Sequence, residues 1–281
     1  MTLIADSGST KTNWCLLKDN GERFFFDTEG YNPYFVDTAY VQRSLAVMIP
    51  ADVHRQPIRH IHFYGAGCFE DKAGIILTAL QSLFSYARIN VQLDLLASAQ
   101  AVLGDEPGFV AILGTGTNSC LYDGRKIVSN IDSLGYILGD EGSGFSIGRK
   151  LLGDFIRGYM PEAVERAFID SYRLTREDIM ERIYTGPLPN RFCASFTEFI
   201  QTCPVDREYT HGIVRSAFNE FFTNLVTHYP GYRQYTFNCV GSVGFVYKNL
   251  LQELATAYGM TTGIILKEPI SGLADYYARR R

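Results

Sequence analysis

The feature that most constrains the fold is an arrangement of short strands and small-residue turns that occurs twice along the chain. In the first copy, apolar runs at residues 2–5 and 13–17 flank a turn of small residues, and Asn20-Gly21 then leads into a third run at 23–26. Asn-Gly between two such runs is a strong signal for a β-hairpin. The chain is therefore predicted to begin with three antiparallel strands.

The second copy begins near residue 109 and keeps the same order. Apolar runs at 109–113 and 119–122 flank the small-residue turn 114–118, and an Asp-Gly turn leads into a third run at 126–128. The two copies share little identity beyond a Gly-Ser/Thr core followed by Cys-Leu. We interpret the pattern as a structural duplication, whose natural product is two similar domains.

The rest of the chain is predicted from the period of its apolar residues. The predicted strands lie at residues 60–64, 91–93, 235–240 and 263–267, and the predicted helices at 72–86, 95–104, 149 to about 229 (with a break near 187–190), 246–258 and after Pro269. We predict an α/β protein of two domains, residues 1–107 and 108–268. The region 149–229 would be a helical insertion in the second domain, and a final helix at 269–281 would rejoin the first.

Composition excludes several classes of partner. The net charge is −4 without a run of basic residues, and nucleic-acid-binding proteins carry a basic face. No segment approaches the roughly 18 consecutive apolar residues of a membrane span, and the start of the chain lacks the pattern of a secretion signal. The six cysteines are scattered without a CxxC pair, as expected of free thiols in a cytoplasmic protein.

The two turns of the repeat are candidate phosphate sites. Neither GxxxxGK[ST] nor GxGxxG is present, because the nearest approach, Gly142-x-Gly144-x-x-x-Gly148, is one residue too long. Backbone N–H groups in Gly-, Ser- and Thr-rich turns can instead surround a polyphosphate from two sides. Glycine and threonine also form ordinary turns, so each turn alone is weak evidence, whereas two of them in matching positions favour phosphate binding.

Two aspartates follow predicted strands. Asp6 ends the first strand, where it could form a local Asx turn or act as a Mg²⁺ contact beside bound phosphates. Asp94 lies between a strand and a helix, where it could be a helix N-cap or take a proton from a hydroxyl that attacks phosphorus. The residues alone leave both alternatives open.

The segment 134–148, LGYILGDEGSGFSIG, contains five glycines and two adjacent acids. Glycine at this density indicates a sharply bent backbone or a close approach to a ligand. Asp140 could accept hydrogen bonds from a polyol, and Glu141 could do likewise or face water. Asn32, in Gly-Tyr-Asn-Pro, is either simple turn chemistry or a second polar contact.

Taken together, DSGSTKT, ILGTGTNS, GDEGSG and VGSVG, in this order, resemble the BadF/BadG/BcrA/BcrD ATPase-like family and within it N-acetylglucosamine kinases. The resemblance covers nearly the whole chain. It implies an actin/hexokinase-like (ribonuclease H-like) duplicated fold with a central cleft. It also implies ATP and Mg²⁺ as cofactors and an amino sugar as the small-molecule substrate.

The resemblance also assigns residues. The first turn would bind the ATP phosphates through Asp6, Gly8, Ser9, Thr10, Lys11 and Thr12, with Asp6 near Mg²⁺ through water, and the second turn through Thr115 and Gly116. Gly241 and Ser242 would line the adenosine site. The sugar would contact Asn32, Asp94, Ser133, Leu134, Gly135 and Asp140, and Asp94 would be the general base.

The implied reaction is phosphoryl transfer from ATP to an N-acetylhexosamine, with N-acetylglucosamine phosphorylated at its 6-OH as the main prediction. Ser133-Leu134-Gly135-Tyr136 departs from the family's Gly-Gly-Trp, and Asn32 lacks the family's following tryptophan. Phosphorylation of N-acetylmuramic acid or glucosamine therefore stays an alternative. Two others are an activase-type ATPase with an iron–sulfur cluster and a non-catalytic sugar-binding protein. A homodimer is also left open.

Overall fold

The computed structural model describes residues 1–8, 10–69 and 71–280. Ser9, one of the predicted phosphate contacts, lies outside these residues. The chain forms two compact units. Unit 1 comprises Met1–Gly108, Tyr122–Val128 and Glu268–Arg281, and unit 2 comprises Phe109–Leu121 and Ser129–Lys267.

Unit 1 is built on a five-stranded sheet whose order is β3-β2-β1-β4-β5. Its strands are β1 (Thr2–Ser7), β2 (Lys11–Leu17), β3 (Arg23–Glu29), β4 (His60–Gly65) and β5 (Arg88–Leu93). The β1–β2 and β2–β3 pairs are antiparallel, which confirms the predicted opening of the chain. The β1–β4 and β4–β5 pairs are parallel.

Alternation along the strands gives this sheet two apolar faces. Leu3 and Ala5 pack in one buried cluster, on the side of α1 (Thr38–Met48), α2 (Ala51–His54) and α3 (Ala73–Leu83). Ile4 packs in a second cluster with α4 (Asp94–Leu103) and α14 (Ile270–Ala278). The sheet of unit 1 is therefore covered by helices on both faces.

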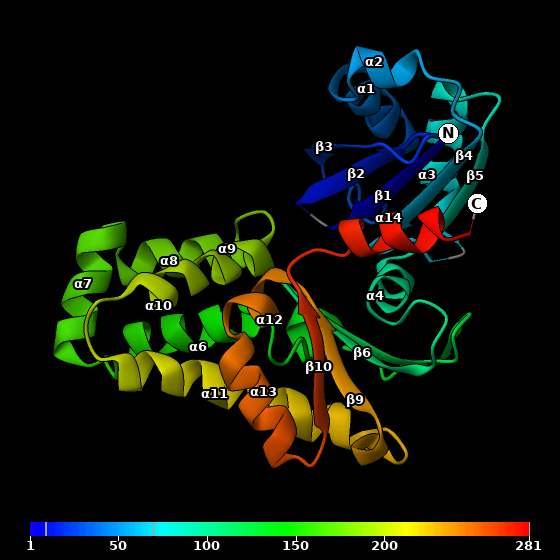
Figure 1. The fold of residues 1–281 in the computed structure, drawn as a ribbon. Helices are drawn as coiled ribbons and strands as arrows, with labels where there is room; N and C mark the ends of the chain where they lie inside the picture. Colours follow the sequence, from blue (N-terminus) through cyan, green and yellow to red (C-terminus); the bar gives the residue numbers. More distant parts are fainter. Residues whose placement is uncertain (9, 70, 281) are drawn as a thin grey trace. The chain divides into compact units, whose positions relative to one another are not determined.

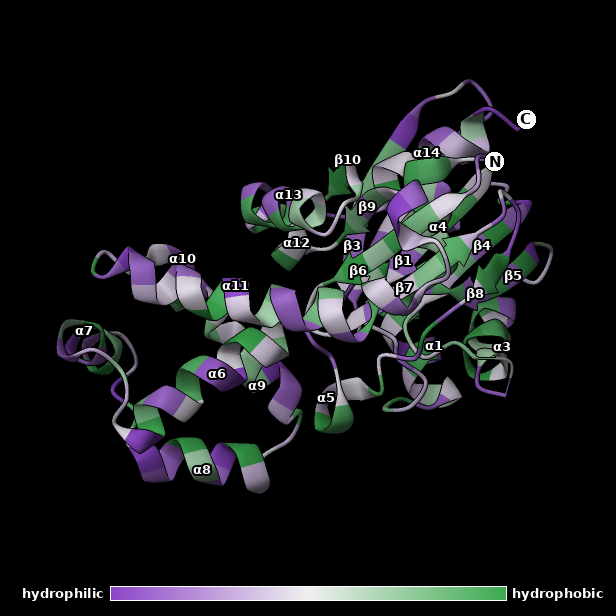
Figure 2. Cartoon of the chain, turned by 90° about the horizontal axis from the view of Figure 1, so that it is seen from below, coloured by the Kyte–Doolittle hydropathy of each residue, from purple (hydrophilic) through white to green (hydrophobic). Residues whose placement is uncertain are grey.

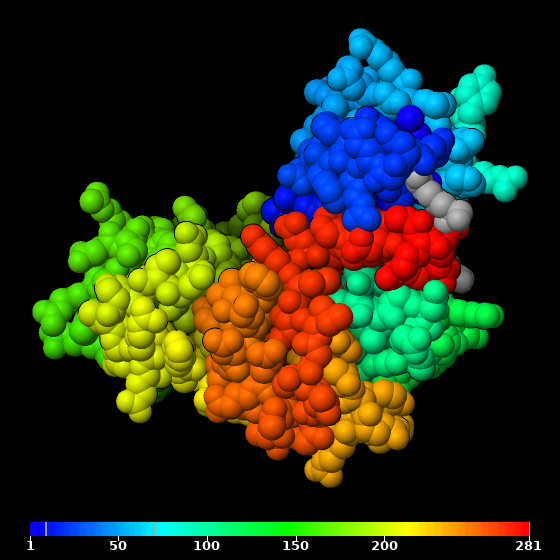
Figure 3. Space-filling view, in the orientation of Figure 1, coloured from blue at the N-terminus to red at the C-terminus, as the bar shows by residue number. Residues whose placement is uncertain are grey.

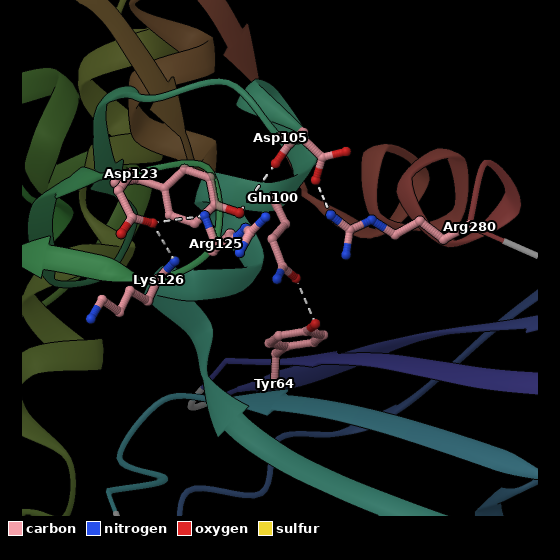
Figure 4. A network of polar contacts seen from close by, with 9 residues as sticks. Tyr64, Gln100, Asp105, Asp123, Arg125, Lys126 and Arg280 are labelled. Carbon is pink, nitrogen blue, oxygen red and sulfur yellow. Dashed lines mark hydrogen bonds and ion pairs between the residues drawn. The ribbon is translucent and has the colours of Figure 1, made fainter.

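Helix α14 closes the second face of this sheet, although it comes from the far end of the sequence (red in Figure 1 and Figure 3). Gly272 allows close packing, because a Cβ there would lie 2.5 Å from the carbonyl oxygen of Ala101 in α4. Arg280 forms an ion pair with Asp105, close to a hydrogen bond of 2.6 Å from Tyr64 to Gln100 (Figure 4).

Unit 2 repeats the strand order of unit 1. Its sheet contains β6 (Gly108–Leu113), β7 (Thr117–Tyr122), β9 (Thr236–Val240) and β10 (Thr261–Leu266), and β8 (Ile127–Ser129), most of which belongs to unit 1, pairs at its edge. The strand order is β10-β9-β6-β7-β8. In both sheets the fourth strand runs parallel to the first and the fifth runs parallel to the fourth. The shared order confirms the duplicated, two-domain α/β fold of actin-like and hexokinase-like proteins.

Most helices of unit 2 lie between its third and fourth strands, where unit 1 has only α1 and α2. They are α5 (Gly135–Leu138), α6 (Gly144–Arg157), α7 (Glu162–Tyr172), α8 (Arg176–Tyr184), α9 (Pro189–Ser195), α10 (Thr197–Thr202), α11 (Arg207–Asn224) and the 3₁₀ turns Val226–His228 and Tyr232–Gln234. Figure 2 shows the strands mostly in apolar colours and large hydrophilic areas on α7 and α8. These helices pack through a buried, phenylalanine-rich cluster that continues onto the sheet.

Several predicted boundaries differ from the structure. Helices α1 and α2 are absent from the predictions. The helix predicted at 246–258 is two helices, α12 (Ser242–Val246) and α13 (Lys248–Ala257), because Tyr247 leaves helical geometry with φ −102° and ψ 26°. The helical region predicted from residue 149 begins at Gly144, where the Ser143 side chain accepts a hydrogen bond from the Ser146 N–H.

Two global features agree with the composition. Within the described residues, no helix is both long and apolar enough to cross a membrane. All six cysteines are buried and none of them forms a disulfide bond, so the fold is stabilised by packing and hydrogen bonds.

Candidate active site

The first phosphate turn joins β1 to β2 in unit 1. It is closed by a hydrogen bond of 2.9 Å from the Gly8 N–H to the carbonyl oxygen of Lys11. Thr10 is exposed, and its carbonyl oxygen accepts a bond of 3.0 Å from the Gly30 N–H. The Gly8 N–H is thus used within the turn, whereas the side chain of Thr10 faces solvent.

Thr12 behaves differently from its predicted role. The sequence predicts that it contacts phosphate, whereas in the structure its side chain is fully buried. Its hydroxyl group lies 2.7 Å from the hydroxyl group of Ser7 and donates a bond of 2.8 Å to the carbonyl oxygen of Glu29. The Thr12 hydroxyl group therefore makes its hydrogen bonds to other groups of the protein.

Lys11 lies at the edge of the same turn, near two carboxylates. Its ammonium nitrogen is 3.1 Å from Asp27 and 3.9 Å from Glu268. All three side chains are well exposed, and such pairs contribute little to stability. Lys11 therefore keeps a mobile charge that could turn towards a phosphate.

Asp6 is the last residue but one of β1, just before this turn, and its carboxyl group is largely withdrawn from water. Burial and the nearby charges of Asp94 and Glu268 raise its pKa to about 7, although a hydrogen bond from Asn13 opposes the rise. Asn13 faces Asp6 across the β1–β2 pair. The negative charges of Asp94 and Glu268 thus act on Asp6 in the same direction as burial, and both disfavour its ionised form.

Asp94 is the first residue of α4, where β5 ends. Leu93 occupies the N-cap position, so the N-cap alternative does not hold. Burial raises the pKa of Asp94 to about 6, while hydrogen bonds from the N–H groups of Leu95 and of Asp94 itself oppose the rise. A carboxylate with a pKa near neutrality, held at a helix start, is suited to general-base chemistry.

Asn32 lies in the loop that follows β3. Its side-chain oxygen accepts a bond of 3.0 Å from the Tyr34 N–H, and its carbonyl oxygen accepts one of 2.9 Å from Phe35. Gly67 packs against it so closely that a Cβ would lie 2.5 Å from the Asn32 side-chain oxygen. Asn32 therefore forms the turn that the sequence allows, and these contacts fix the position of its side-chain amide.

The second phosphate turn, residues 114–116, belongs to unit 2 and is joined to the segment rich in glycine and acids. The Thr117 N–H donates a bond of 2.9 Å to the Asp140 carboxylate, and a Cβ at Gly116 would lie 3.1 Å from that carboxylate. The Phe145 N–H donates a bond of 3.1 Å to the carbonyl oxygen of Thr115. The structure therefore brings Thr115, Gly116 and Asp140 together.

Asp140 is almost fully buried, and its backbone is in the left-handed region with φ 57°. Burial raises its pKa to about 6, and the charge of Glu141 adds to the rise, while the Thr117 N–H lowers it. Its own N–H donates a bond of 2.9 Å to the carbonyl oxygen of Ser133. Asp140 thus joins the second turn to the predicted sugar loop.

The loop predicted to bind sugar has a strained residue, Leu134, and exposed apolar side chains. Leu134 has φ 59° and Gly135 has φ 65°. The side chain of Leu134 is exposed, as are those of Ile137 and Leu138 in the short helix α5. Ser133 is the residue through which this loop contacts Asp140.

Gly241 and Ser242, the predicted adenosine residues, lie where β9 meets α12. Gly241 has φ 131°, and a Cβ there would lie 2.3 Å from the carbonyl oxygen of Leu113 and 3.1 Å from the Gly114 nitrogen. Only glycine fits this approach. The predicted adenosine residues are thus adjacent to the second phosphate turn.

Each unit therefore gathers its own part of the predicted site. Unit 1 holds the first turn, Asn32 and Asp94, and unit 2 holds the second turn, the sugar loop with Asp140, and Gly241. Ser7, Asn13 and Glu268 were not among the predicted site residues. Ser7 and Asn13 take their places through the register of the paired strands, and Glu268 does so because the chain returns to unit 1 after unit 2. Of these three residues, only Asn13 could have been predicted from the nearby sequence, because the hairpin register places it opposite Asp6.

No protein-family model matches the chain. A solved structure of a candidate N-acetylglucosamine kinase from Porphyromonas gingivalis is 40% identical, covers 99% of both chains and superposes with a TM-score of 0.93.

A curated relative from Clostridium acetobutylicum, an N-acetylmuramic acid/N-acetylglucosamine kinase, is 28% identical over 171 residues, which are 57% of this chain. The match spans about half (54%) of that relative's length. A ROK family glucokinase from Streptomyces griseus, solved with glucose and AMPPNP, shares the fold at 12% identity, with a TM-score of 0.54 over 100% of this chain and 99% of the other.

Proposed function

We propose that this chain, which belongs to the family of the Porphyromonas gingivalis candidate N-acetylglucosamine kinase, phosphorylates an N-acetylhexosamine with ATP. The substrate we favour is N-acetylglucosamine, phosphorylated at its 6-hydroxyl group. The observation that carries the proposal is Asp94, a carboxylate at the start of a helix whose pKa is raised to about 6. A sugar kinase requires such a base beside its phosphate site.

Asp94 would accept the proton of the attacking hydroxyl group as the new oxygen–phosphorus bond forms. The base is most effective when its pKa lies just below the working pH, because it is then both ionised and basic. Asp94 and Asp6 are near enough for their charges to interact, since the charge of Asp94 raises the pKa of Asp6. Asn32 would hold the sugar so that its hydroxyl group faces Asp94.

Backbone N–H groups of the two turns would hold the phosphates. Hydrogen bonds that are already in place need no reorganisation during the reaction and so stabilise the charge that develops on the transferred group. The bonds that close the turns at Gly8 and Gly114, of 2.9 and 3.0 Å, keep these loops in shape.

Asp6 is the residue that fits Mg²⁺. No group of three or more metal-binding side chains occurs among residues 1–8, 10–69 and 71–280, and Mg²⁺ bound to a nucleotide does not need one, since it takes one or two carboxylates with phosphate oxygens and water. Burial is the main cause of the raised pKa of Asp6, about 7, and a cation bound beside the carboxylate would oppose this rise. When bound, Mg²⁺ would neutralise phosphate charge.

The iron–sulfur alternative is not favoured by the cysteine environments. Cluster ligands are thiolates, whereas burial raises the pKa of both Cys68 and Cys120 to about 12. N-acetylmuramic acid remains the second candidate substrate, because the Clostridium acetobutylicum relative is named for it.

The test is ADP release from Mg·ATP with N-acetylglucosamine, N-acetylmuramic acid, N-acetylmannosamine, glucosamine, glucose or no sugar. We expect turnover confined to one or two N-acetylhexosamines and reduced about 10²–10⁴-fold in Asp94→Asn. Asp123→Asn is the control, because Asp123 is an exposed carboxylate in the β7–β8 turn. Equal ADP release with and without sugar would refute the proposal.

A further inference from the structure

A buried chain of hydrogen bonds connects the first phosphate turn with the loop that carries Asn32. The Tyr31 N–H lies 3.0 Å from the hydroxyl oxygen of Ser7, which lies 2.7 Å from the Thr12 hydroxyl. The Thr12 hydroxyl in turn lies 2.8 Å from the carbonyl oxygen of Glu29. Ser7 and Thr12 are both fully buried.

The groups at the two ends of this chain of hydrogen bonds determine which group donates in each bond. A backbone N–H can only donate, so Ser7 accepts from Tyr31; a carbonyl oxygen can only accept, so Thr12 donates to Glu29. The single proton of Ser7 is then directed to Thr12. Each hydroxyl group donates once and accepts once, and bonds arranged in this way strengthen one another.

Backbone bonds reinforce the same connection on both sides. The Gly30 N–H donates to the carbonyl oxygen of Thr10, at 3.0 Å, within the phosphate turn. The Ala66 N–H donates to the carbonyl oxygen of Ser7, at 2.9 Å, and the next residue, Gly67, packs against the Asn32 amide. The phosphate turn and the loops around Asn32 are therefore one hydrogen-bonded body, and its side-chain links are Ser7 and Thr12.

We infer that Ser7 and Thr12 are positioning residues that couple nucleotide binding to sugar binding. A phosphate bound beside Gly8 and Thr10 would, through Ser7 and Thr12, also restrict residues 29–32 and so the Asn32 amide. Sugar bound at Asn32 would order the turn by the same path. This inference rests on the proposed function, since it takes the turn as the phosphate site and Asn32 as a sugar contact.

The test measures the coupling itself. The affinity for N-acetylglucosamine is determined by calorimetry with and without saturating Mg·AMPPNP, and the affinity for Mg·AMPPNP with and without the sugar. In the wild type we expect each ligand to strengthen the other by the same factor, between about 5 and 150, because coupling free energies are reciprocal. Ser7→Ala and Thr12→Val should bring this factor to about one.

Two further variants separate coupling from general destabilisation. Thr28→Val is the matched control, because the Thr28 hydroxyl is also buried and accepts a bond of 2.9 Å from Trp14. It shares the Glu29 carbonyl oxygen with Thr12, at 3.1 Å, but has no part in the links from Tyr31 through Ser7 to Thr12. Thr28→Val should keep the coupling factor. Thr12→Ser keeps the hydroxyl group and should also retain it.

The outcomes are distinguishable. A coupling factor unchanged in Ser7→Ala and Thr12→Val, or equally reduced in Thr28→Val, would overturn the inference. A wild-type factor of one would overturn it as well. Failure of the proposed function would instead appear as no sugar-dependent ADP release by the wild type.

Discussion

Asp94→Asn should stabilise unit 1, although the proposed function predicts that it lowers activity. The carboxylate of Asp94 is partly withdrawn from water, and burial is the main cause of its raised pKa. A group whose folded-state pKa is raised binds its proton more tightly in the folded chain than in the unfolded one. Its negative form therefore destabilises the fold.

The magnitude follows from the two pKa values. A rise from 3.8 to about 6 corresponds to roughly 3 kcal/mol at about 1.36 kcal/mol for each pH unit. Because the side chain keeps some exposure, we expect asparagine to raise the free energy of unfolding by about 2–3 kcal/mol at pH 8. The difference should shrink as the pH falls from 6 to 4, since the wild-type carboxyl group is then protonated in the fold.

Trp14 provides the assay. It is the only tryptophan, and it is fully buried in β2 of unit 1. Urea unfolding followed by its fluorescence therefore reports on the unit that contains Asp94. The midpoints of the wild type and Asp94→Asn are compared at pH 8 and at pH 4.

Asp123→Asn is the control of opposite sign. The backbone N–H groups of Lys126 and Arg125 lower the pKa of Asp123, so its carboxylate stabilises the fold at pH 8 and the variant should be less stable there. The reasoning is refuted if Asp94→Asn is no more stable than the wild type at pH 8, or if its gain is the same at pH 4.

Three further predictions concern activity and the two turns. Since Asp94 acts when ionised, kcat/KM should fall as the pH drops below about 6, and a flat profile between pH 5 and 7 would contradict its role. Gly241→Ala should lower the free energy of unfolding, measured by denaturation, by about 2–4 kcal/mol. The reason is that the alanine Cβ would lie 2.3 Å from the carbonyl oxygen of Leu113. No measurable change would show that the backbone there relaxes. Asp140→Ala should cost about 1–3 kcal/mol, because it leaves the Thr117 N–H without its acceptor, and a neutral effect would mean that water replaces the carboxylate.

Local chemistry was enough to predict much of the fold. Asn20-Gly21 and Asp123-Gly124 mark hairpins wherever they occur, and the strands beside them were found within a few residues. Helix α1 was missed because only two of its residues, Val41 and Leu45, are buried. An apolar pattern that sparse is a weak helical signal, although Asp37 caps the helix by accepting a bond from the Tyr40 N–H.

Some residues of the candidate site could likewise be predicted from the local sequence, whereas others depend on the tertiary fold. Asp6 and Asp94 could be identified because each follows an apolar strand. The approach of Glu268 to Asp6 could not be predicted, because it depends on a segment far along the chain returning to unit 1. The inward turn of the Thr12 hydroxyl depends on Glu29 and Ser7, two partners that become neighbours only when β1, β2 and β3 pair.

The place of helix α14 has a consequence for synthesis on the ribosome. Ile4, Cys15 and Leu17 in unit 1 pack in one cluster with Ile270 and Leu273 of α14, which are translated after the whole of unit 2. A nascent chain would therefore leave part of this face of the first sheet uncovered until α14 leaves the exit tunnel, by which time unit 2 has emerged. Unit 2 should thus be the first to reach its native form during translation, and chaperone contacts during synthesis should concentrate on the N-terminal strands.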